Sequence, residues 1–231
     1  MTVISHSKKL IFIHNYKVAG TSIEYALRRY DNKTFWKSTL KDQFAFLTNA
    51  YPPVYSSEFS PHITAADLQK SLSGDLFSKY FKFGFVRDPW DWQVSMYSYI
   101  LKTKEHHQHE LVKSMRSFDQ FIEWRIREDF HLQKEFFYDE NGTCLMDYIG
   151  KFETLESSIQ KLFDMFRLDT NLLHLNQSRE NFDYLHYYSQ YSIDLVAEAY
   201  KDDIETFGYT KPKLARIVKA PDYTHMVANA G

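Results

Sequence analysis

The sequence contains a single cysteine, Cys144, so no disulfide can form within the chain, which fits a reducing compartment. It has no run of about 18 apolar residues, and we therefore expect no membrane-spanning helix. The first nine residues, Met1 to Lys9, lack the apolar stretch of a secretory signal peptide. These absences predict a soluble cytoplasmic protein.

An excess of positive charge is also missing, because 28 basic residues are offset by 30 acidic residues to give a net charge of −2. A strongly basic face of the kind that binds nucleic acid is therefore not expected, and no polybasic cluster indicates a membrane surface. Any anionic ligand has to be held by a small local site rather than by the field of the whole chain.

Repeats, low-complexity tracts and linkers are absent from the 231 residues, a length that one domain can accommodate. A chain of this length buries a full hydrophobic core without disulfides. We expect a single domain over residues 1–231, with a polar, helix-prone and variable segment at about 102–143.

Short apolar runs alternate with helical patterns along the chain. Buried strands are expected at 8–14, 80–86, 145–152 and 172–175. Helices are expected at 23–30, 65–72, 89 to about 102, 153–166 and 192–207. Thr64 is suited to cap the second of these helices, and Asp88 with Pro89 to begin the third. The alternation predicts an α/β fold, a three-layer sandwich with a central, mainly parallel sheet flanked by helices.

The first candidate site is a loop that follows the first expected strand and precedes a helix. Amides at a helix N-terminus bind anions, and the helix dipole adds partial positive charge. Gly20 permits close approach of the backbone, and Thr21 and Ser22 add hydroxyl donors. Lys17 can meet charge that develops on a leaving oxygen. The loop is not a Walker A motif, because its lysine precedes the glycine, so it predicts either a different phosphate loop or an ordinary turn.

Arg87 and Ser95 form a second candidate site. Arg87 lies at the end of the second strand, where ligands bind in open α/β sheets, and arginine can hold a phosphate through two hydrogen bonds. Ser95 lies about six residues into the following helix, roughly 9 Å along its axis. The two side chains could share one phosphate. Alternatively, Arg87 pairs with Asp88 or Asp91, and Ser95 is a surface residue.

Together the two motifs resemble those of the sulfotransferases that use 3′-phosphoadenosine 5′-phosphosulfate (PAPS), especially a cytoplasmic, bacterial-like part of the carbohydrate-type branch. Residues 13–22 (IHNYKVAGTS) are similar to that family's 5′-phosphosulfate loop, and residues 85–91 (FVRDPWD) with Ser95 are similar to its 3′-phosphate motif. The likeness continues at 147–155, 175–178 and 200–209, and is weakest at about 102–143. It implies a P-loop-like fold.

The resemblance also implies that PAPS is the donor, that adenosine 3′,5′-bisphosphate (PAP) is the product, and that no metal takes part. The residues that would bind the nucleotide are Lys17, Val18, Ala19, Gly20, Thr21, Ser22, Arg87, Ser95, Tyr148, Ile149 and Gly150. The last three would form a turn against the adenine. Two positions depart from the family pattern, because Tyr16 replaces a proline and Val18 replaces a hydroxyl residue.

Transfer to a hydroxyl also needs a general base, and histidine suits neutral pH. His62 lies between the two motifs, just before a helix, and is similar in placement to the histidine base of some carbohydrate sulfotransferases. Other branches use glutamate, so Glu58 and Glu24 remain alternatives, and His62 could instead be a capping residue. Lys17 and His62 are therefore the expected catalytic residues.

The remaining histidines and several aromatic residues have less specific interpretations. His14 is expected to be structural, and His106, His107 and His109 are expected to lie on a solvated face rather than at a metal site. The aromatic residues that could line an acceptor pocket, although each is more typical of core or surface, are Trp36, Tyr51, Tyr55, Trp90 and Trp92.

The sequence thus predicts an enzyme that transfers a sulfuryl group from PAPS to a hydroxyl of a carbohydrate or of a small molecule such as a secondary metabolite. A P-loop-like kinase that uses ATP is an alternative, opposed by the missing Walker A motif and by the lack of an evident Mg²⁺-binding aspartate after an apolar strand. A non-catalytic nucleotide-binding module is another alternative, opposed by Lys17 and His62. The expected partner is the acceptor, without nucleic acid, metal or a membrane span.

Overall fold

The computed structural model describes residues 1–72, 75–172 and 183–214 of the chain. Among these residues, four short strands form one sheet in the order β1 (Val3–Ser5), β2 (Leu10–Phe12), β3 (Phe81–Val86) and β4 (Tyr148–Lys151). Strands β2, β3 and β4 run parallel, whereas β1 is antiparallel to β2. The expectation of an α/β fold with a mainly parallel sheet is therefore confirmed.

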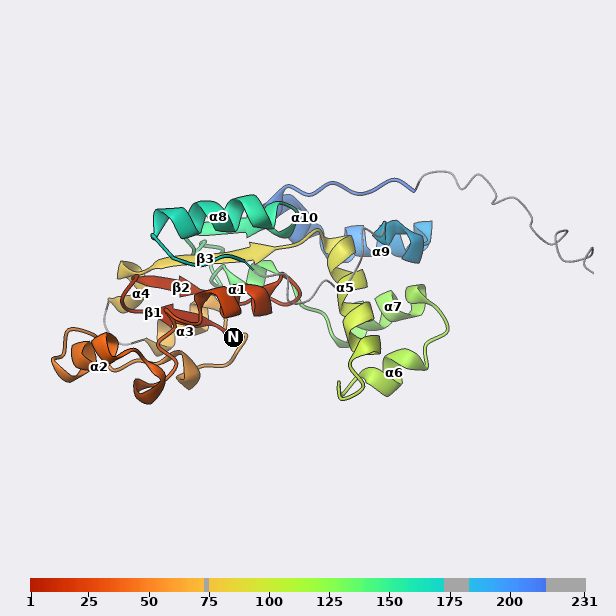
Figure 1. Cartoon of the computed structure of the whole chain (residues 1–231). Helices are drawn as coiled ribbons and strands as arrows, with labels where there is room; N and C mark the ends of the chain where they lie inside the picture. The colour runs from red at the N-terminus through yellow and green to blue at the C-terminus, as the bar shows by residue number, and fades with distance from the viewer. Residues whose placement is uncertain (73–74, 173–182, 215–231) are drawn as a thin grey trace, which may run out of the picture.

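Helices follow each parallel strand and pack around the sheet (Figure 1). The α-helices are α1 (Gly20–Leu27), α2 (Leu40–Leu47), α3 (Ala65–Ser71), α4 (Leu76–Lys79), α5 (Pro89–Lys102), α6 (His109–Lys113), α7 (Phe118–Glu128), α8 (Leu155–Met165), α9 (Gln190–Ala199) and α10 (Lys201–Phe207). Short 3₁₀ turns are η1 (Phe35–Lys37), η2 (Ser56–Glu58), η3 (Lys134–Phe136), η4 (Phe152–Thr154) and η5 (Tyr184–Tyr187).

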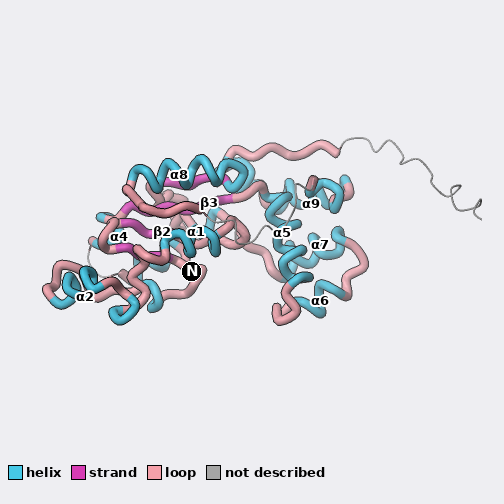
Figure 2. The backbone as a smooth tube through the Cα atoms, viewed as in Figure 1, coloured by secondary structure: helices cyan, strands magenta, loops and turns pink. Residues whose placement is uncertain are grey.

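The hydrophobic core is divided by the sheet, because successive side chains of a strand point to opposite faces. Leu10 and Phe12 of β2 pack in one cluster with α1 and α8, whereas Ile11 packs in another with α3 and α4. A third cluster joins α5, α6, α7 and α9 in a helical lobe beyond the end of β3, to the right of the sheet in Figure 2. Helices therefore cover both faces of the sheet.

The register of the sheet places three loops at one edge. Phe12 is paired with Phe83, and Val86 with Lys151, so the residues that follow β2, β3 and β4 leave the sheet at its carboxyl end. This is the edge at which open α/β sheets bind ligands. The helix after β3 begins as expected, because Asp88 accepts hydrogen bonds from the amides of Trp90 and Asp91 and Pro89 is its first residue.

Several expected elements differ from the structure. Strand β1 was not expected, because its apolar residues are few; it forms since Val3 and Ile4 are fully buried beside β2. The closing helix at 192–207 is two helices, α9 and α10, which meet at Tyr200. Tyr200 is fully buried there against Trp92, at a ring-centroid distance of 6.0 Å. Most of the expected strand at 172–175 lies outside the described residues.

The strand expected within 145–152 is confirmed as β4, and the turn expected at 148–150 is therefore wrong, because these residues form that strand. A Cβ atom on Gly150 would lie 2.3 Å from the ring of Phe85. Gly150 therefore allows β4 to pack closely against the ring of Phe85 in the core.

Candidate functional site

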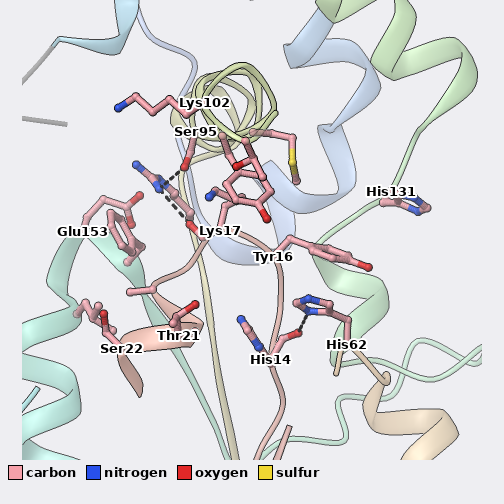
Figure 3. Close-up of a pocket in the computed structure, with 18 of the residues that line it drawn as sticks. His14, Tyr16, Lys17, Thr21, Ser22, His62, Ser95, Lys102, His131 and Glu153 are labelled. Carbon is pink, nitrogen blue, oxygen red and sulfur yellow. Dashed lines mark hydrogen bonds between the residues drawn. The ribbon is translucent and has the colours of Figure 1, made fainter. Parts of the chain in front are cut away.

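A cavity of about 1280 Å³ opens at the carboxyl edge of the sheet, between the loop after β2 and the helical lobe (Figure 3). Among the residues that line it are most of those predicted from the two motifs: Lys17, Ala19, Gly20, Thr21, Ser22, His62, Arg87 and Ser95. Segments that are far apart in the sequence thus meet around one space large enough for a nucleotide and a second molecule.

The N-terminus of α1 faces this cavity. Helix α1 begins at Gly20, three residues earlier than expected, so Gly20, Thr21 and Ser22 form its first turn. Ala19 at the N-cap position has a left-handed backbone (φ 60°) and provides no side-chain cap. Lys17 is left-handed as well (φ 60°). Amides of a first helical turn have no partner within the helix, and this turn is therefore suited to an anion.

His14 explains why position 20 is a glycine. A Cβ atom on residue 20 would lie 1.6 Å from Nε2 of His14, so the imidazole occupies the space that any other residue would need. His14 is buried, and burial lowers its pKa to about 2, which keeps the ring neutral. The expectation that His14 is structural fits this packing, although its ring also lines the cavity.

Arg87 connects the two motifs. Its Nη1 donates to the backbone carbonyl of Lys17 at 3.0 Å and contacts Oγ of Ser95 at 3.0 Å (Figure 3). Its Nε donates to Oδ2 of Asp91 at 2.6 Å, and its guanidinium lies 4.1 Å from the ring centroid of Phe152. Arg87 is therefore adjacent to Ser95 and is also paired with Asp91, whereas the alternative that Ser95 is a surface residue is wrong, because Ser95 is fully buried.

The ammonium group of Lys17 lies within the same cavity. Its Nζ is 3.9 Å from the ring centroid of Tyr99 on α5, a cation–π contact that holds the side chain across the space. Since Arg87 fixes the backbone carbonyl of Lys17 and Tyr99 lies under its ammonium, both ends of this residue are positioned by side chains that follow β3.

His62 lies beside the loop, with Nδ1 2.9 Å from the carbonyl oxygen of His14. A carbonyl oxygen only accepts hydrogen bonds, so Nδ1 carries the proton in the neutral ring and Nε2 keeps a lone pair. The ring of Tyr16 lies 4.0 Å away, centroid to centroid. Burial lowers the pKa of His62, and the hydrogen bond to His14 partly offsets this effect. The ring is therefore a neutral acceptor near pH 7.

The two glutamates considered as alternatives have other partners. Glu58 accepts a hydrogen bond from the amide of Tyr55 and belongs to the cap of η2. Glu24 accepts hydrogen bonds from Lys33 at 3.1 Å and from the amino group of Met1 at 2.7 Å. Burial alone would raise the pKa of Glu24, but these hydrogen bonds outweigh it and lower the pKa. Neither glutamate is among the residues that line the cavity.

Some predicted contacts lie elsewhere in the described structure. The side chain of Val18 is fully buried in the core with α1 and does not line the cavity. Tyr148, Ile149 and Gly150 lie in β4 and do not line the cavity, whereas residues 152–157 immediately after β4 do. Tyr148, Ile149 and Gly150 lie outside the cavity because β4 pairs with β3.

The other histidines and aromatics also divide between site and core. His109 is buried, with Nδ1 2.9 Å from the carbonyl of Ile100, so the expected solvated position is wrong for this residue. His107 is exposed and His106 is partly exposed, as expected, and both line the cavity. The aromatic residues considered for the pocket are instead core or surface: Trp90 and Trp92 are fully buried, Tyr51 and Tyr55 pack beside Phe46, and Trp36 is exposed.

Sequence reasoning missed a supporting residue, Gln133, from the segment predicted to be variable. Its side chain accepts from the amide of Arg87 at 2.9 Å and donates to the carbonyl of Arg87 at 2.7 Å. It also accepts from the side-chain amide of Asn15 at 3.0 Å, so it connects the two cavity loops. Its own amide donates to Asp203, whose pKa burial raises to about 6. No local pattern around Gln133 marks this role.

The sheet, the N-terminus of α1 and the buried arginine are typical of α/β proteins with a site suited to an anion at the carboxyl edge of the sheet. A family model described as "Sulfotransferase family" matches residues 1–210, and the chain therefore belongs to the sulfotransferase family. This membership implies a transferase of sulfuryl groups, and the family generally uses PAPS as donor. The comparisons with curated proteins and with solved structures found no match.

Two further findings concern the described residues alone. No helix among them is both long and apolar enough to cross a membrane. No group of histidine, cysteine, aspartate and glutamate side chains among them is arranged to hold a metal ion.

Proposed function

We propose that the protein is a PAPS-dependent O-sulfotransferase that acts on a hydroxyl of a carbohydrate or small-molecule acceptor. One observation carries the proposal: the Arg87 guanidinium joins the carbonyl of Lys17 to Ser95 within a cavity that His62 also lines. A kinase is not favoured, because the chain belongs to the sulfotransferase family and its loop is not a Walker A motif. A P-loop-like three-layer sandwich, a single domain and a cytoplasmic location remain predictions.

The residues around the cavity fit an adenosine bisphosphate donor. The first turn of α1, with Lys17, would bind the 5′-phosphosulfate, since its amides, hydroxyls and ammonium all favour negative charge. Arg87 and Ser95 would bind the 3′-phosphate, which distinguishes this donor from ATP. The adenine contact expected at residues 148–150 remains a prediction, and residues 152–157 are the part of that region that lines the cavity.

PAPS supplies an activated sulfuryl group, whose bond to the 5′-phosphate breaks as the acceptor oxygen bonds to sulfur. His62 would accept the hydroxyl proton at Nε2, because its Nδ1 proton is held by the carbonyl of His14. The Lys17 ammonium would stabilise the negative charge that develops on the leaving phosphate oxygen. Because burial lowers the pKa of His62, its ring is neutral near pH 7, as a proton acceptor has to be.

The part of the cavity beside His62 would receive the acceptor. It is lined by His62 and Tyr16 and by residues of the segment after α5, including His106. Polar and aromatic side chains alternate there, a composition suited to sugar rings and hydroxylated aromatic molecules.

Thermal unfolding with excess PAP, and separately with ATP–Mg²⁺, tests the donor. A ligand at 100 times its Kd adds about 2.7 kcal/mol, and each kcal/mol raises the Tm by roughly 2–4 °C for a chain of this size. We expect PAP to raise the Tm by several degrees and ATP–Mg²⁺ to have little effect. Stabilisation by ATP–Mg²⁺ alone would exclude the proposal, whereas stabilisation by PAP justifies an acceptor screen with PAPS.

A further inference from the structure

An exposed apolar face covers η1 and α2, whose residues do not line the cavity. Its four side chains are Trp36 and Leu40, each 84% exposed, Leu47, 72% exposed, and Phe44, 68% exposed. Leu40, Phe44 and Leu47 are spaced by four and three residues and therefore share one side of α2. The other large apolar side chains exposed in the described residues are single ones on different elements, and none exceeds 64%. Such a contiguous exposed patch marks an interaction surface.

Packing on the inner side of η1 and α2 keeps the apolar face on the surface of a folded element. Phe46, on the opposite side of α2, is buried against His6, with ring centroids 5.4 Å apart and an edge-to-face angle. Phe35 packs edge-on to Trp36 at 5.1 Å and also contacts Phe46 at 6.3 Å. The N-terminus of α2 is capped by Thr39, which accepts from the amide of Asp42. The outer side chains are thus fixed on a folded element and are not an unfinished part of the core.

The exposed charged side chains of η1 and α2 are both lysines. Asp42 is the single carboxylate of residues 32–57 in the sequence, and it is buried and bonded to Thr39. Lys37 and Lys41 lie between the apolar residues and are exposed. The chain as a whole is slightly acidic, so this basic character is local. Exposed apolar side chains with a tryptophan and interspersed lysines are typical of a helix that lies in the headgroup region of an anionic bilayer.

We propose that η1 and α2 dock the protein onto an anionic lipid surface, with the four apolar side chains inserted and Lys37 and Lys41 on the headgroups. Helix α2 lies at one end of the molecule, at the lower left in Figure 1. A bilayer accepts a helix at the end of a molecule without a matching groove. A second copy of the chain fits less well, because a symmetric contact through this face would bring the lysines of both copies together.

Vesicle sedimentation tests the proposal without any measurement of transfer. We expect the protein to sediment with vesicles of phosphatidylcholine and phosphatidylserine, more weakly with phosphatidylcholine alone, and less as salt increases. Trp36 should then shift its fluorescence to shorter wavelength, since Trp90 and Trp92 are already buried and Trp124 packs against the helical lobe. Trp124→Phe should leave the shift unchanged. Lys37→Glu with Lys41→Glu should weaken binding by about 25-fold or more, from about fivefold per basic side chain near an anionic surface.

The apolar contribution is tested with Leu40→Ser combined with Phe44→Ser, which should abolish sedimentation. The matched control is Leu111→Ser, which removes an exposed leucine from α6 and should bind as the parent does. An unchanged Tm and unchanged stabilisation by PAP confirm that the variants remain folded. Because this experiment measures lipid binding alone, an absence of vesicle binding would not affect the proposed transferase function. An absence of PAP binding would likewise not affect the lipid result.

Three results would overturn the proposal. One is no sedimentation with either kind of vesicle, and another is sedimentation that persists in the Leu40→Ser, Phe44→Ser variant. The third is a dimer in analytical ultracentrifugation that this variant dissociates while vesicles fail to bind the parent, which would assign the face to a second copy of the chain.

Discussion

The guanidinium of Arg87 donates a hydrogen bond to the backbone carbonyl of Lys17 at 3.0 Å, although the two residues are 70 positions apart. One side chain therefore sets the shape of the loop whose ammonium and amides face the cavity. Because the same Nη1 contacts Ser95, the geometry of both motifs depends on a single buried group. We expect substitutions at Arg87 to affect the two halves of the donor site together.

Arg87→Lys should weaken PAP binding by roughly tenfold to a hundredfold, because a hydrogen bond to a charged group contributes about 1.5–3 kcal/mol. Lysine lacks the planar fork that reaches Lys17, Ser95 and Asp91 at once. Isothermal titration with PAP measures the change. Ser95→Ala is the matched control and should lose less, since Arg87 keeps its contacts with Lys17 and Asp91. Equal losses of PAP affinity in the two variants would show that the contacts of Arg87 with Lys17 and Asp91 have no special importance for binding.

Lys17→Ala should lower kcat for transfer from PAPS by about 10² to 10³-fold, the usual cost of removing one donor that stabilises developing charge. PAP binding should fall less, because the amides of α1 and Arg87 remain. The unliganded Tm should not change by more than a few degrees, since the side chain contributes a cation–π contact with Tyr99. Lys102→Ala removes another lysine from the same cavity and controls for charge alone. Full turnover by Lys17→Ala would remove Lys17 from the mechanism.

The sequence predicted the parts of the fold whose signals are local. Thr64 and Asp88-Pro89 begin their helices as expected, because capping depends on the next three residues. Strand β1 was missed because it is only three residues long, although it pairs with the neighbouring strand β2. The break at Tyr200 depends on a partner distant in the chain, Trp92, and the periodicity of the flanking residues carries no sign of it. The strand expected within 145–152 was predicted from its apolar residues, whereas the turn implied there by the family resemblance is wrong, since these residues pair with β3.

The candidate site divides in the same way. The residues around Lys17 and Arg87 were predicted because each lies at the end of an apolar run, and the parallel register then brings those ends together. The role of Gln133 could not be predicted, because it depends on hydrogen bonds with Arg87 and Asn15, which are distant in the sequence. The left-handed backbone at Lys17 and Ala19 was missed as well, since neither is a residue type that favours it.

His62→Gln should lower kcat by about 10² to 10⁴-fold with little change in the KM for PAPS, because the amide can still donate to the carbonyl of His14 but cannot take a proton. In the parent, kcat/KM should be constant above neutral pH and fall in acid, with an apparent pKa below 6.5, since burial lowers the pKa of His62. Glu58→Gln is the control and should retain activity. An unchanged pH profile in the residual activity of His62→Gln would indicate a different base.

Gly20→Ala should destabilise the protein by at least about 2 kcal/mol, since overpacking in a filled site costs about 1–3 kcal/mol and the new Cβ would overlap the His14 ring at 1.6 Å. His14→Ala removes that ring but leaves its backbone carbonyl for His62. In the His14→Ala background, Gly20→Ala should therefore cost little. Urea denaturation of the two single variants and the double variant measures the coupling free energy. Additive costs would show that the two residues do not compete for space.

His14 should also make the stability of the protein sensitive to acid. Its folded-state pKa is lowered by burial to about 2, against about 6.5 when unfolded, so the unfolded state binds a proton first as the pH falls. The stability that neutral His14 provides is complete above pH 6.5 and is lost progressively below it, by about 2 kcal/mol at pH 5. Asp88 and Asp203 act in the opposite direction, because burial raises the pKa of each to about 6 and so favours the folded state as the pH falls from 6 towards 4.

Comparison with His14→Gln isolates the histidine from these two carboxyl groups, which are the same in both proteins. Between pH 7 and pH 5 the free energy of unfolding of the parent, measured in urea, should fall by about 2 kcal/mol more than that of His14→Gln. If the free energies of unfolding of the two proteins change in parallel over that interval, the His14 ring titrates normally in the folded protein. That result would also contradict the tight packing of the ring against Gly20.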